Sequence, residues 1–269
     1  MQQPWSGTPS SARYLGRLTS SEVEQRLSPA SILCLPIGAW EQHGPHLPLD
    51  TDTILADRFA CRVAERWQHQ HDVWLLPPIP YGLSREHKWA AGTVSLSIRL
   101  FSDLLLGLCE EMAASTPAKN LLIVNGHGGN RGILDAMLYD IEDRFGFNAC
   151  VTHPTALSQV RSGSPMPEVH GGMSETSVML AIASDAVHMD RLPPRSGLGT
   201  SSADAIRELI MDRGASWAWR SDDATIASLG IIGEAHLATS ELGRRIVESA
   251  VEEYGRVFER LAERNSRRE

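Results

Sequence analysis

Residues 121–130 read Leu-Leu-Ile-Val-Asn-Gly-His-Gly-Gly-Asn, a short apolar run that ends in a polar, glycine-rich turn. An apolar run without polar alternation indicates a strand that is buried on both faces. Comparable runs occur at residues 32–37, 73–76 and 149–151. The sequence therefore predicts a sheet whose strands lie inside the protein.

Helical patterns separate these runs. Each interval has apolar residues at helical spacing, namely Leu55, Phe59, Val63 and Trp67, then Leu100, Leu104, Leu108 and Met112, then Ile133, Met137, Ile141 and Phe145. Gly146 is the predicted C-cap of the last helix. Alternating strands and helices favour parallel strands joined by right-handed crossovers. We expect one α/β domain over residues 1–269, a three-layer α/β/α arrangement with a mostly parallel central sheet, and a loosely ordered arm at residues 1–16.

Further elements flank this region. A helix is predicted from Ser21 to Leu27, with Ser21 and Glu24 as a capping box, and a long amphipathic helix from Thr239 to about Arg264. Residues 161–172 and 191–201 are rich in Gly, Pro and Ser and are predicted to be loops. The four cysteines lie far apart within apolar stretches, which is typical of reduced core residues.

Charge and hydropathy narrow the possible partners. The net charge of -8 argues against nucleic acid or an anionic membrane surface as the main partner, because both require clustered basic residues. No window has the roughly 18 uninterrupted apolar residues of a membrane span, and the amino terminus lacks the order of a secretion signal. We therefore expect a cytoplasmic protein with a small-molecule ligand.

Polar residues gather where predicted strands end. Residues 38–52 (GAWEQHGPHLPLDTD) follow the first apolar run, residues 125–130 (NGHGGN) follow the third, and residues 168–177 (EVHGGMSETS) precede an apolar helix. In parallel sheets, ligands bind outside the carboxyl ends of the strands. The imidazole and carboxylate groups of these segments suit zinc, manganese or ferrous iron. The sequence thus predicts a metal site at this edge.

Each candidate residue also has a structural interpretation. Glu41 and His43 are two apart and point to the same side of an extended segment. Asp52 can either cap the following helix or face a cation, and Glu175 can be a first-turn carboxylate that favours the helix dipole. A single histidine such as His127 is often a hydrogen-bonded structural residue. The grouping of all these segments favours metal binding.

The three motifs, in this order and spacing, resemble the creatininase family of metal-dependent amidohydrolases. The resemblance runs from about Ser31 to the carboxy-terminal helix. It implies a parallel α/β sheet, two divalent ions (Zn, Mn or Fe) and a homo-oligomer, often a hexamer. Matched residue by residue, it makes Glu41, His43, Asp52 and His127 metal ligands, with Asp52 as the bridge, and makes His170 the catalytic histidine.

The chain departs from creatininase itself at two positions. Gly129 stands where that enzyme has a metal-binding glutamate, and Met166 stands where it has a tryptophan that shapes the creatinine pocket. These departures disfavour creatinine as the substrate. Glu175, which other members with a GHGGN segment carry, is the expected replacement ligand.

The resulting hypothesis is hydrolysis of a small or cyclic amide C–N bond by water held between two ions, with His170 protonating the departing nitrogen. Alternatives within the family are a formamide deformylase and a peptidase of a cofactor precursor. A metal-dependent binding or scaffold protein is the non-enzymatic alternative.

Other residues are expected near the substrate or between subunits. Glu86 and His87 follow the second strand and either line the same cleft or lie in a solvated loop. With Gly128 and Gly129 they form the predicted substrate-binding set. His46 is a candidate for contact with a metal ligand. Trp217 and Trp219 suit a subunit contact.

Overall fold

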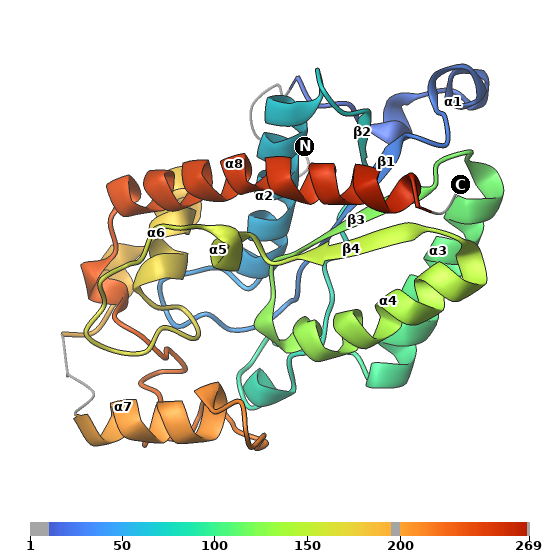
Figure 1. Ribbon diagram of the computed structural model, residues 1–269. Coiled ribbons are helices and arrows are strands. Elements are labelled where there is room, and N and C mark those ends of the chain that lie inside the picture. Colours follow the sequence, from blue (N-terminus) through green and yellow to red (C-terminus); the bar gives the residue numbers. More distant parts are fainter. Residues whose placement is uncertain (1–10, 195–199, 268–269) are drawn as a thin grey trace.

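The computed structural model describes residues 11–194 and 200–267 and contains a four-stranded parallel sheet (Figure 1). The strands are β1 (Ile32–Ile37), β2 (Val73–Leu75), β3 (Asn120–Asn125) and β4 (Asn148–Thr152), in the order β2-β1-β3-β4. Every pairing is parallel. The predicted α/β fold with a mostly parallel sheet is therefore confirmed.

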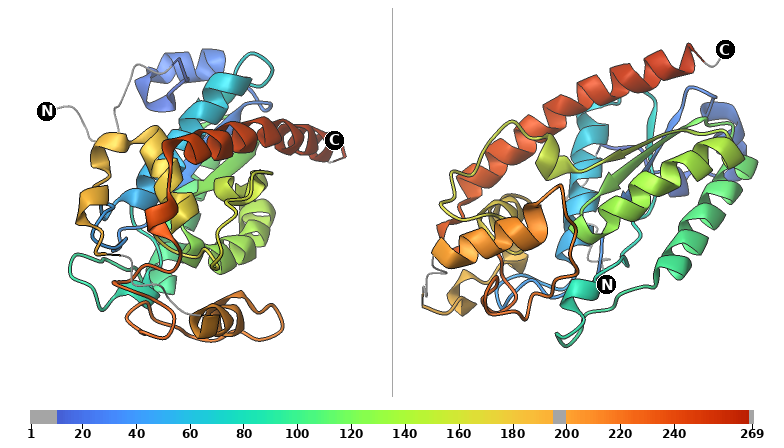
Figure 2. Two further views of the ribbon diagram at one scale, coloured as in Figure 1. Left: turned by 90° about the vertical axis from the view of Figure 1, so that its left-hand side faces the viewer. Right: turned by 60° about the horizontal axis from the view of Figure 1, so that its bottom comes forward.

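Helices cover both faces of the sheet (Figure 2). One face packs against α2 (Thr51–Trp67), α6 (Met173–Ile182) and α8 (Ser240–Asn265). The other face packs against α3 (Ile98–Ser115) and α4 (Arg131–Phe145). Successive strand residues alternate between the two layers, so Cys34 faces α2 and α8 while Leu33 and Leu35 face α3 and α4. Burial on both sides explains why the strands read as continuous apolar runs.

Shorter elements complete the chain. Near the amino terminus lie η1 (Leu15–Arg17) and α1 (Ser20–Arg26). Short helical turns occupy several of the loops, at η2 (Arg85–His87), η3 (Gly128–Asn130), α5 (Pro154–Leu157), η4 (Ser184–Ala186), η5 (Met189–Arg191) and η7 (Ala235–Leu237). Helix α7 (Thr200–Ile206) continues into a π-helical turn, η6 (Arg207–Met211).

The helix ends confirm some predictions and correct one. Gly146 ends α4 in the left-handed conformation, with φ of 71°, and the Thr239 side chain accepts the Leu242 N–H at the start of α8. The capping box of α1 is formed by Thr19 and Glu22, so the prediction of Ser21 and Glu24 is wrong. The N-cap lies two residues earlier than predicted, because Thr19 is extended and its hydroxyl accepts from Glu22 N.

The apolar residues that predicted α3 are not the ones that contact the sheet. The sheet-facing residues are each one position later in the sequence, namely Phe101, Leu105 and Cys109. Leu100, Leu104 and Leu108 lie on the outer side, and Leu100 is 54% exposed. Both stripes are apolar at the same spacing, so periodicity alone does not identify the one that contacts the sheet.

The amino-terminal segment reaches the sheet within the part of the chain that is described. Tyr14 forms a parallel bridge with Leu75, and Arg13 pairs with Asp72 at 2.6 Å. Residues 1–10 of the expected arm, and residues 195–199 of the predicted loop 191–201, lie outside the described residues. The four cysteines are free thiols, and Cys34, Cys61 and Cys109 are buried. Within residues 11–194 and 200–267, none of the helices is long and apolar enough to cross a membrane.

Candidate active site

The site lies at the carboxyl ends of β1 and β3, where the two polar loops meet. Ile37 and Asn125 are paired at the ends of these strands, and Gly126 N donates to Ile37 O at 2.9 Å. A Cβ on Gly126 would lie 2.1 Å from the backbone oxygen of Asp52. Only glycine permits this approach. The NGHGGN segment therefore packs directly on the turn that carries Asp52.

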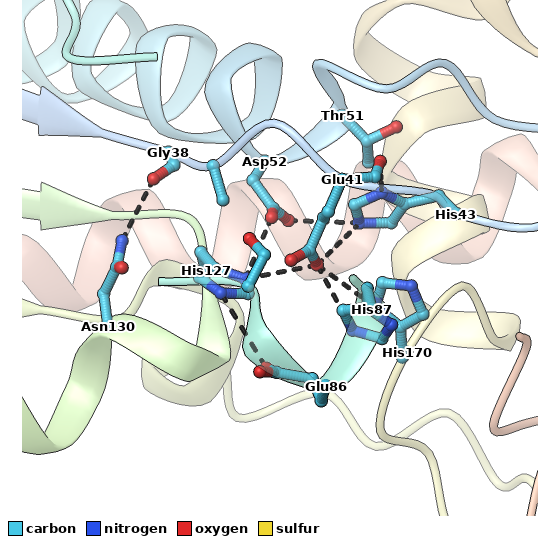
Figure 3. Close-up of polar contacts among 12 residues, drawn as sticks. Gly38, Glu41, His43, Thr51, Asp52, Glu86, His87, His127, Asn130 and His170 are labelled. Atoms are coloured by element: carbon cyan, nitrogen blue, oxygen red, sulfur yellow. Dashed lines mark hydrogen bonds and ion pairs between the residues drawn. The ribbon is translucent and has the colours of Figure 1, made fainter. Parts of the chain in front are cut away.

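Asp52 faces inward from the first turn of α2 and contacts two histidines (Figure 3). Its Oδ1 lies 3.2 Å from His43 Nε2, and its Oδ2 lies 3.0 Å from His127 Nδ1. Asp50, the N-cap residue of α2, makes no side-chain capping hydrogen bond. Asp52 is therefore not the N-cap of α2, and one of its oxygens is directed to each imidazole.

Glu41 is fully buried at the centre of four imidazoles. Its Oε1 lies 3.3 Å from His127 Nδ1, 3.5 Å from both His87 Nε2 and His170 Nδ1, and 3.8 Å from His43 Nε2. While His127 carries its proton on Nε2 alone, neither carboxylate oxygen of Glu41 has a hydrogen-bond partner, and Asp52 Oδ2 lacks one as well. A buried carboxylate without hydrogen bonds is costly unless a cation compensates it. These orphaned oxygens therefore fit a bound metal ion.

Two potential metal triads share Asp52. The first consists of Glu41, Asp52 and His127, and the second of His43, Asp52 and Glu175. Within each triad, the candidate ligand atoms lie within 4.8 Å of one another. Each offers carboxylate oxygen and imidazole nitrogen, the donor set that suits zinc, manganese and ferrous iron. The residues present thus fit divalent ions on both sides of Asp52.

Hydrogen bonds orient the two triad histidines toward the carboxylates. His43 Nδ1–H donates to the Glu41 backbone oxygen at 3.1 Å, and His127 Nε2–H donates to the Leu83 backbone oxygen at 2.7 Å. The other nitrogen of each ring is directed into the cluster. Burial lowers the pKa of His43, but the carboxylates of Asp52 and Glu175 outweigh burial and raise this pKa to about 10. A proton therefore occupies the space between His43 and Asp52 when no metal is bound.

Glu175 reaches the cluster from α6, whereas position 129 has no space for a side chain. Glu175 Oε1 lies 3.9 Å from His43 Nε2, and its Oε2 accepts the Gly171 N–H at 2.6 Å. A Cβ on Gly129 would lie 2.3 Å from the Leu83 backbone oxygen and 2.5 Å from His127 Nε2. The loop through Leu83 thus occupies the space that a ligand at position 129 would need.

His87 and His170 stack on each other beside Glu41. Their ring centroids are 3.9 Å apart and the planes differ by 24°. His170 Nε2 lies 2.7 Å from the Gln42 backbone oxygen, and His87 Nδ1 lies 2.6 Å from Ser221 Oγ. Burial lowers the pKa of His87 to about 3 and lowers that of His170 well below its ordinary value. Both rings are therefore neutral near pH 7.

Glu86 and His87, which were predicted either to line the cleft or to lie in a solvated loop, differ in exposure. His87 is buried, so the solvated-loop alternative does not apply to it. Glu86 is partly exposed, and its Oε1 lies 4.0 Å from His127 Nε2. His46 is buried, and its Nε2 is 2.8 Å from Thr176 Oγ1, next to Glu175 in the sequence.

A cavity of about 910 Å³ opens over this cluster. Gly128, Gly129, Trp217 and Trp219 are among the residues that line it. Trp219 also meets the His87 ring edge-on, with centroids 5.9 Å apart. The two tryptophans, expected at a subunit contact, therefore form part of the cavity wall.

Three polar residues of the site escaped sequence analysis. The Gln42 side chain lies within hydrogen-bonding distance of His87 and His170, and Ser221 bonds to His87. Asn130 Nδ2 donates to Gly38 O at 3.0 Å, and its Oδ1 accepts the Leu83 N–H at 2.9 Å. Asn130 belongs to the NGHGGN motif, which was a usable signal, whereas Ser221 stands in no recognisable pattern.

Comparisons with known proteins identify the family of the chain. The family model described as "Creatininase: Creatinine amidohydrolase" matches residues 16–258. A mycofactocin precursor peptide peptidase from Mycobacterium ulcerans is 35% identical over 248 residues, with 89% of each chain covered. A creatinine amidohydrolase from Pseudomonas putida is 29% identical over 205 residues, which is 66% of this chain and 75% of that protein.

A solved structure described as "Creatininase Mn" has the same fold. It superposes with a TM-score of 0.74 at 24% identity and covers 94% of this chain and 99% of its own. The family match spans most of the described residues and includes all three motifs. The chain therefore belongs to the creatininase family and is a hydrolase that acts on C–N bonds.

Proposed function

We propose that the protein hydrolyses an amide C–N bond with two divalent ions held on either side of Asp52. The observation that carries this proposal is the pair of triads that share Asp52, one completed by Glu41 and His127 and the other by His43 and Glu175. When bound, the ions would supply an activated water molecule and polarise the substrate carbonyl. The orphaned carboxylate oxygens of Glu41 and Asp52 support this assignment.

His170 is the proposed catalytic histidine. Its Nε2–H is held by the Gln42 backbone oxygen, which leaves the Nδ1 lone pair directed toward Glu41 Oε1, 3.5 Å away. A neutral imidazole in this position accepts a proton from the attacking water and delivers it to the departing nitrogen. His170 is buried, so bulk water does not compete for that proton.

The proposed substrate is a precursor peptide. The relatives at 33 to 35% identity over 88 to 89% of the chain are described as mycofactocin precursor peptide peptidases. The cavity of about 910 Å³ has room for several amino-acid residues, far more than one small cyclic amide needs. We propose that Glu86, His87, Gly128 and Gly129, which line this cavity, contact the peptide.

The test is a substrate screen with the Mn- or Zn-loaded protein. Short peptides, lactams and formamides are incubated at equal concentration, and amine release is followed by mass spectrometry. We expect peptide cleavage to exceed lactam and formamide hydrolysis. Faster lactam hydrolysis would restore the small cyclic amide as the substrate, and faster formamide hydrolysis would indicate a deformylase. No turnover by protein that binds metal would indicate a binding or scaffold protein.

A further inference from the structure

The side chain of Gln42 has a fixed orientation at the back of the site. Its Oε1 accepts the Gly44 N–H at 2.9 Å, and its Nε2 lies 3.2 Å from the Gly230 backbone oxygen. Exchanging the amide oxygen and nitrogen would place two acceptors against each other at Gly230 and two donors at Gly44. Gln42 is buried, so these losses would not be compensated by water. The amide nitrogen therefore faces Gly230 and the histidines.

This orientation determines the tautomer of His87. Gln42 Nε2 carries two protons, and one of them goes to the Gly230 backbone oxygen. The second is assigned to His87 Nδ1 at 3.0 Å rather than to His170 Nε2 at 3.2 Å, because His170 Nε2 itself donates to the Gln42 backbone oxygen at 2.7 Å. His87 Nδ1 is then the acceptor. Ser221 is consistent with this assignment, because its Oγ accepts the Trp89 Nε1–H at 2.8 Å and its hydroxyl proton has two acceptors in reach, His87 Nδ1 at 2.6 Å and the Glu86 backbone oxygen at 3.4 Å, of which Nδ1 is much the nearer. With Nδ1 as acceptor, the neutral ring carries its proton on Nε2. That nitrogen is directed into the metal cluster, 3.5 Å from Glu41 Oε1.

The stacked rings thus present opposite hydrogen-bonding groups to one space. His170 exposes the lone pair of Nδ1, because its Nε2–H bonds to the Gln42 backbone oxygen. His87 exposes the Nε2–H. We propose that His87 is a second catalytic histidine, a neutral hydrogen-bond donor to the carbonyl oxygen of the substrate, and that Gln42 and Ser221 are the residues that position it. This inference rests on the proposed hydrolysis of an amide bond.

In the proposed reaction, His170 transfers a proton and His87 donates a hydrogen bond. Water forms a C–O bond with the carbonyl carbon, and its proton passes to His170 Nδ1. The carbonyl oxygen gains negative charge, and the His87 Nε2–H stabilises that charge without giving up its proton. The C–N bond then breaks as His170 returns the proton to the nitrogen, which yields a carboxylic acid and an amine. His87 ends the cycle in the tautomer in which it began.

The alternative is that His87 is a metal ligand. Glu41, Glu86 and His87 also form a group with suitable spacing. A ligating Nε2 would have to lose its proton, which would move to Nδ1. Nδ1–H would then face the amide protons of Gln42 at 3.0 Å. The orientation of Gln42 opposes this arrangement, so the two roles of His87 make different predictions.

Nitrogen chemical shifts test the tautomer directly. The zinc-loaded protein is labelled with ¹⁵N-histidine, and the His87 signals are assigned by their loss in His87→Ala. We expect a protonated Nε2 and an unprotonated Nδ1. A protonated Nδ1, or an Nε2 shift typical of a zinc ligand, would overturn the proposal. This readout does not require a substrate, so it remains decisive if the screen above finds no hydrolysis.

Kinetics and metal content then test whether His87 acts as the hydrogen-bond donor to the substrate. We expect His87→Ala to retain its zinc and lower kcat on the order of 100-fold, with KM changed little, since removing one oxyanion donor has effects of this size. His87→Gln, which keeps an N–H donor at about the same reach, should recover part of the loss. The exposed His69→Ala is the matched control and should match the parent. Loss of one zinc ion in His87→Ala, or unchanged kcat, would refute the assignment.

Discussion

His43 Nε2 lies 3.2 Å from Asp52 Oδ1, and both side chains are buried among further carboxylates. Without a metal ion, a proton between these atoms balances part of the negative charge, which is why the pKa of His43 rises to about 10. A divalent ion that binds His43 must displace this proton. The proposed metal site therefore coincides with the position of this proton.

The first prediction follows from this competition. Because His43 stays protonated in the metal-free protein up to a pKa of about 10, binding of a metal ion must release this proton at every pH from 6 to 9, and a lower pH opposes that release. We expect zinc affinity to rise about tenfold or more per pH unit between pH 6 and pH 9. Titration calorimetry in buffers of different ionisation enthalpy should show release of at least one proton per chain. Affinity that is independent of pH would contradict this account.

A second prediction concerns the shared carboxylate. Elemental analysis of protein purified without chelator should approach two divalent ions per chain, because Asp52 belongs to two triads. Asp52→Ala should lose more metal than Glu41→Ala, since Glu41 belongs to only one of the two triads that contain Asp52. A stable metal content below one ion per chain in the parent would rule out the dinuclear site.

Glu175 and His170 should respond differently to mutation. Glu175→Gln removes the charge that faces His43, so the ion in that triad should bind weakly while the other remains. His170→Ala should keep both ions and slow turnover by roughly 100-fold or more, the usual range for loss of a general acid or base. Metal analysis alongside kcat separates the two roles. If Glu175→Gln retains both ions, Glu175 is only a first-turn helix carboxylate.

Asp57 provides a prediction for stability rather than activity. Burial raises the pKa of Asp57 from 3.8 to about 6. The folded protein therefore binds this proton more tightly than the unfolded chain, and Asp57 costs stability as the pH rises from about 4 to above 6. Asp57→Asn should raise the free energy of unfolding by about 1 to 2 kcal/mol at pH 8 and have little effect at pH 4. Denaturant unfolding at both pH values measures this, with the exposed Asp140→Asn as control.

We also propose a homo-oligomer, with the outer stripe of α3 as a contact. Leu100, Leu104 and Leu108 are exposed there. Of the expected contact residues, Trp217 is also exposed, and both Trp217 and Trp219 line the cavity. Light scattering at micromolar protein should give a mass above the 29.5 kDa of one chain. Leu100→Glu should lower that mass, since it places a charge on the stripe. A monomeric parent protein would remove this proposal.

The sequence was sufficient for the sheet and for most of the candidate site. Parallel strands align their carboxyl ends, so polar residues after β1 and β3 were bound to meet, and Glu41, Asp52 and His127 do so. The apolar pattern did not show which face of a helix contacts the sheet when two neighbouring faces are equally apolar. The stripe of α3 at Leu100 differs from the buried stripe at Phe101 by one residue and has the same spacing.

Contacts between distant segments were also beyond prediction from local patterns. Ser221 reaches His87 across 134 positions of sequence, and nothing near Ser221 marks it as part of the site. Gln42 lies in the sequence between Glu41 and His43, two expected ligands. Its orientation, however, depends on a hydrogen bond to Gly230, and no local pattern places the loop of Gly230 near Gln42. Such roles arise from the fold as a whole rather than from a motif.

The close approach of Gly129 to the Leu83 oxygen has an evolutionary consequence. A glutamate at position 129, where creatininase has a ligand, would meet that oxygen at its first side-chain carbon, 2.3 Å away. The same oxygen holds His127 in its ligand orientation. A single Gly129→Glu change would therefore damage the first triad before it supplied a new ligand. To place a ligand at position 129, this chain would need changes in both loops, at Gly129 and around Leu83, and not a single substitution.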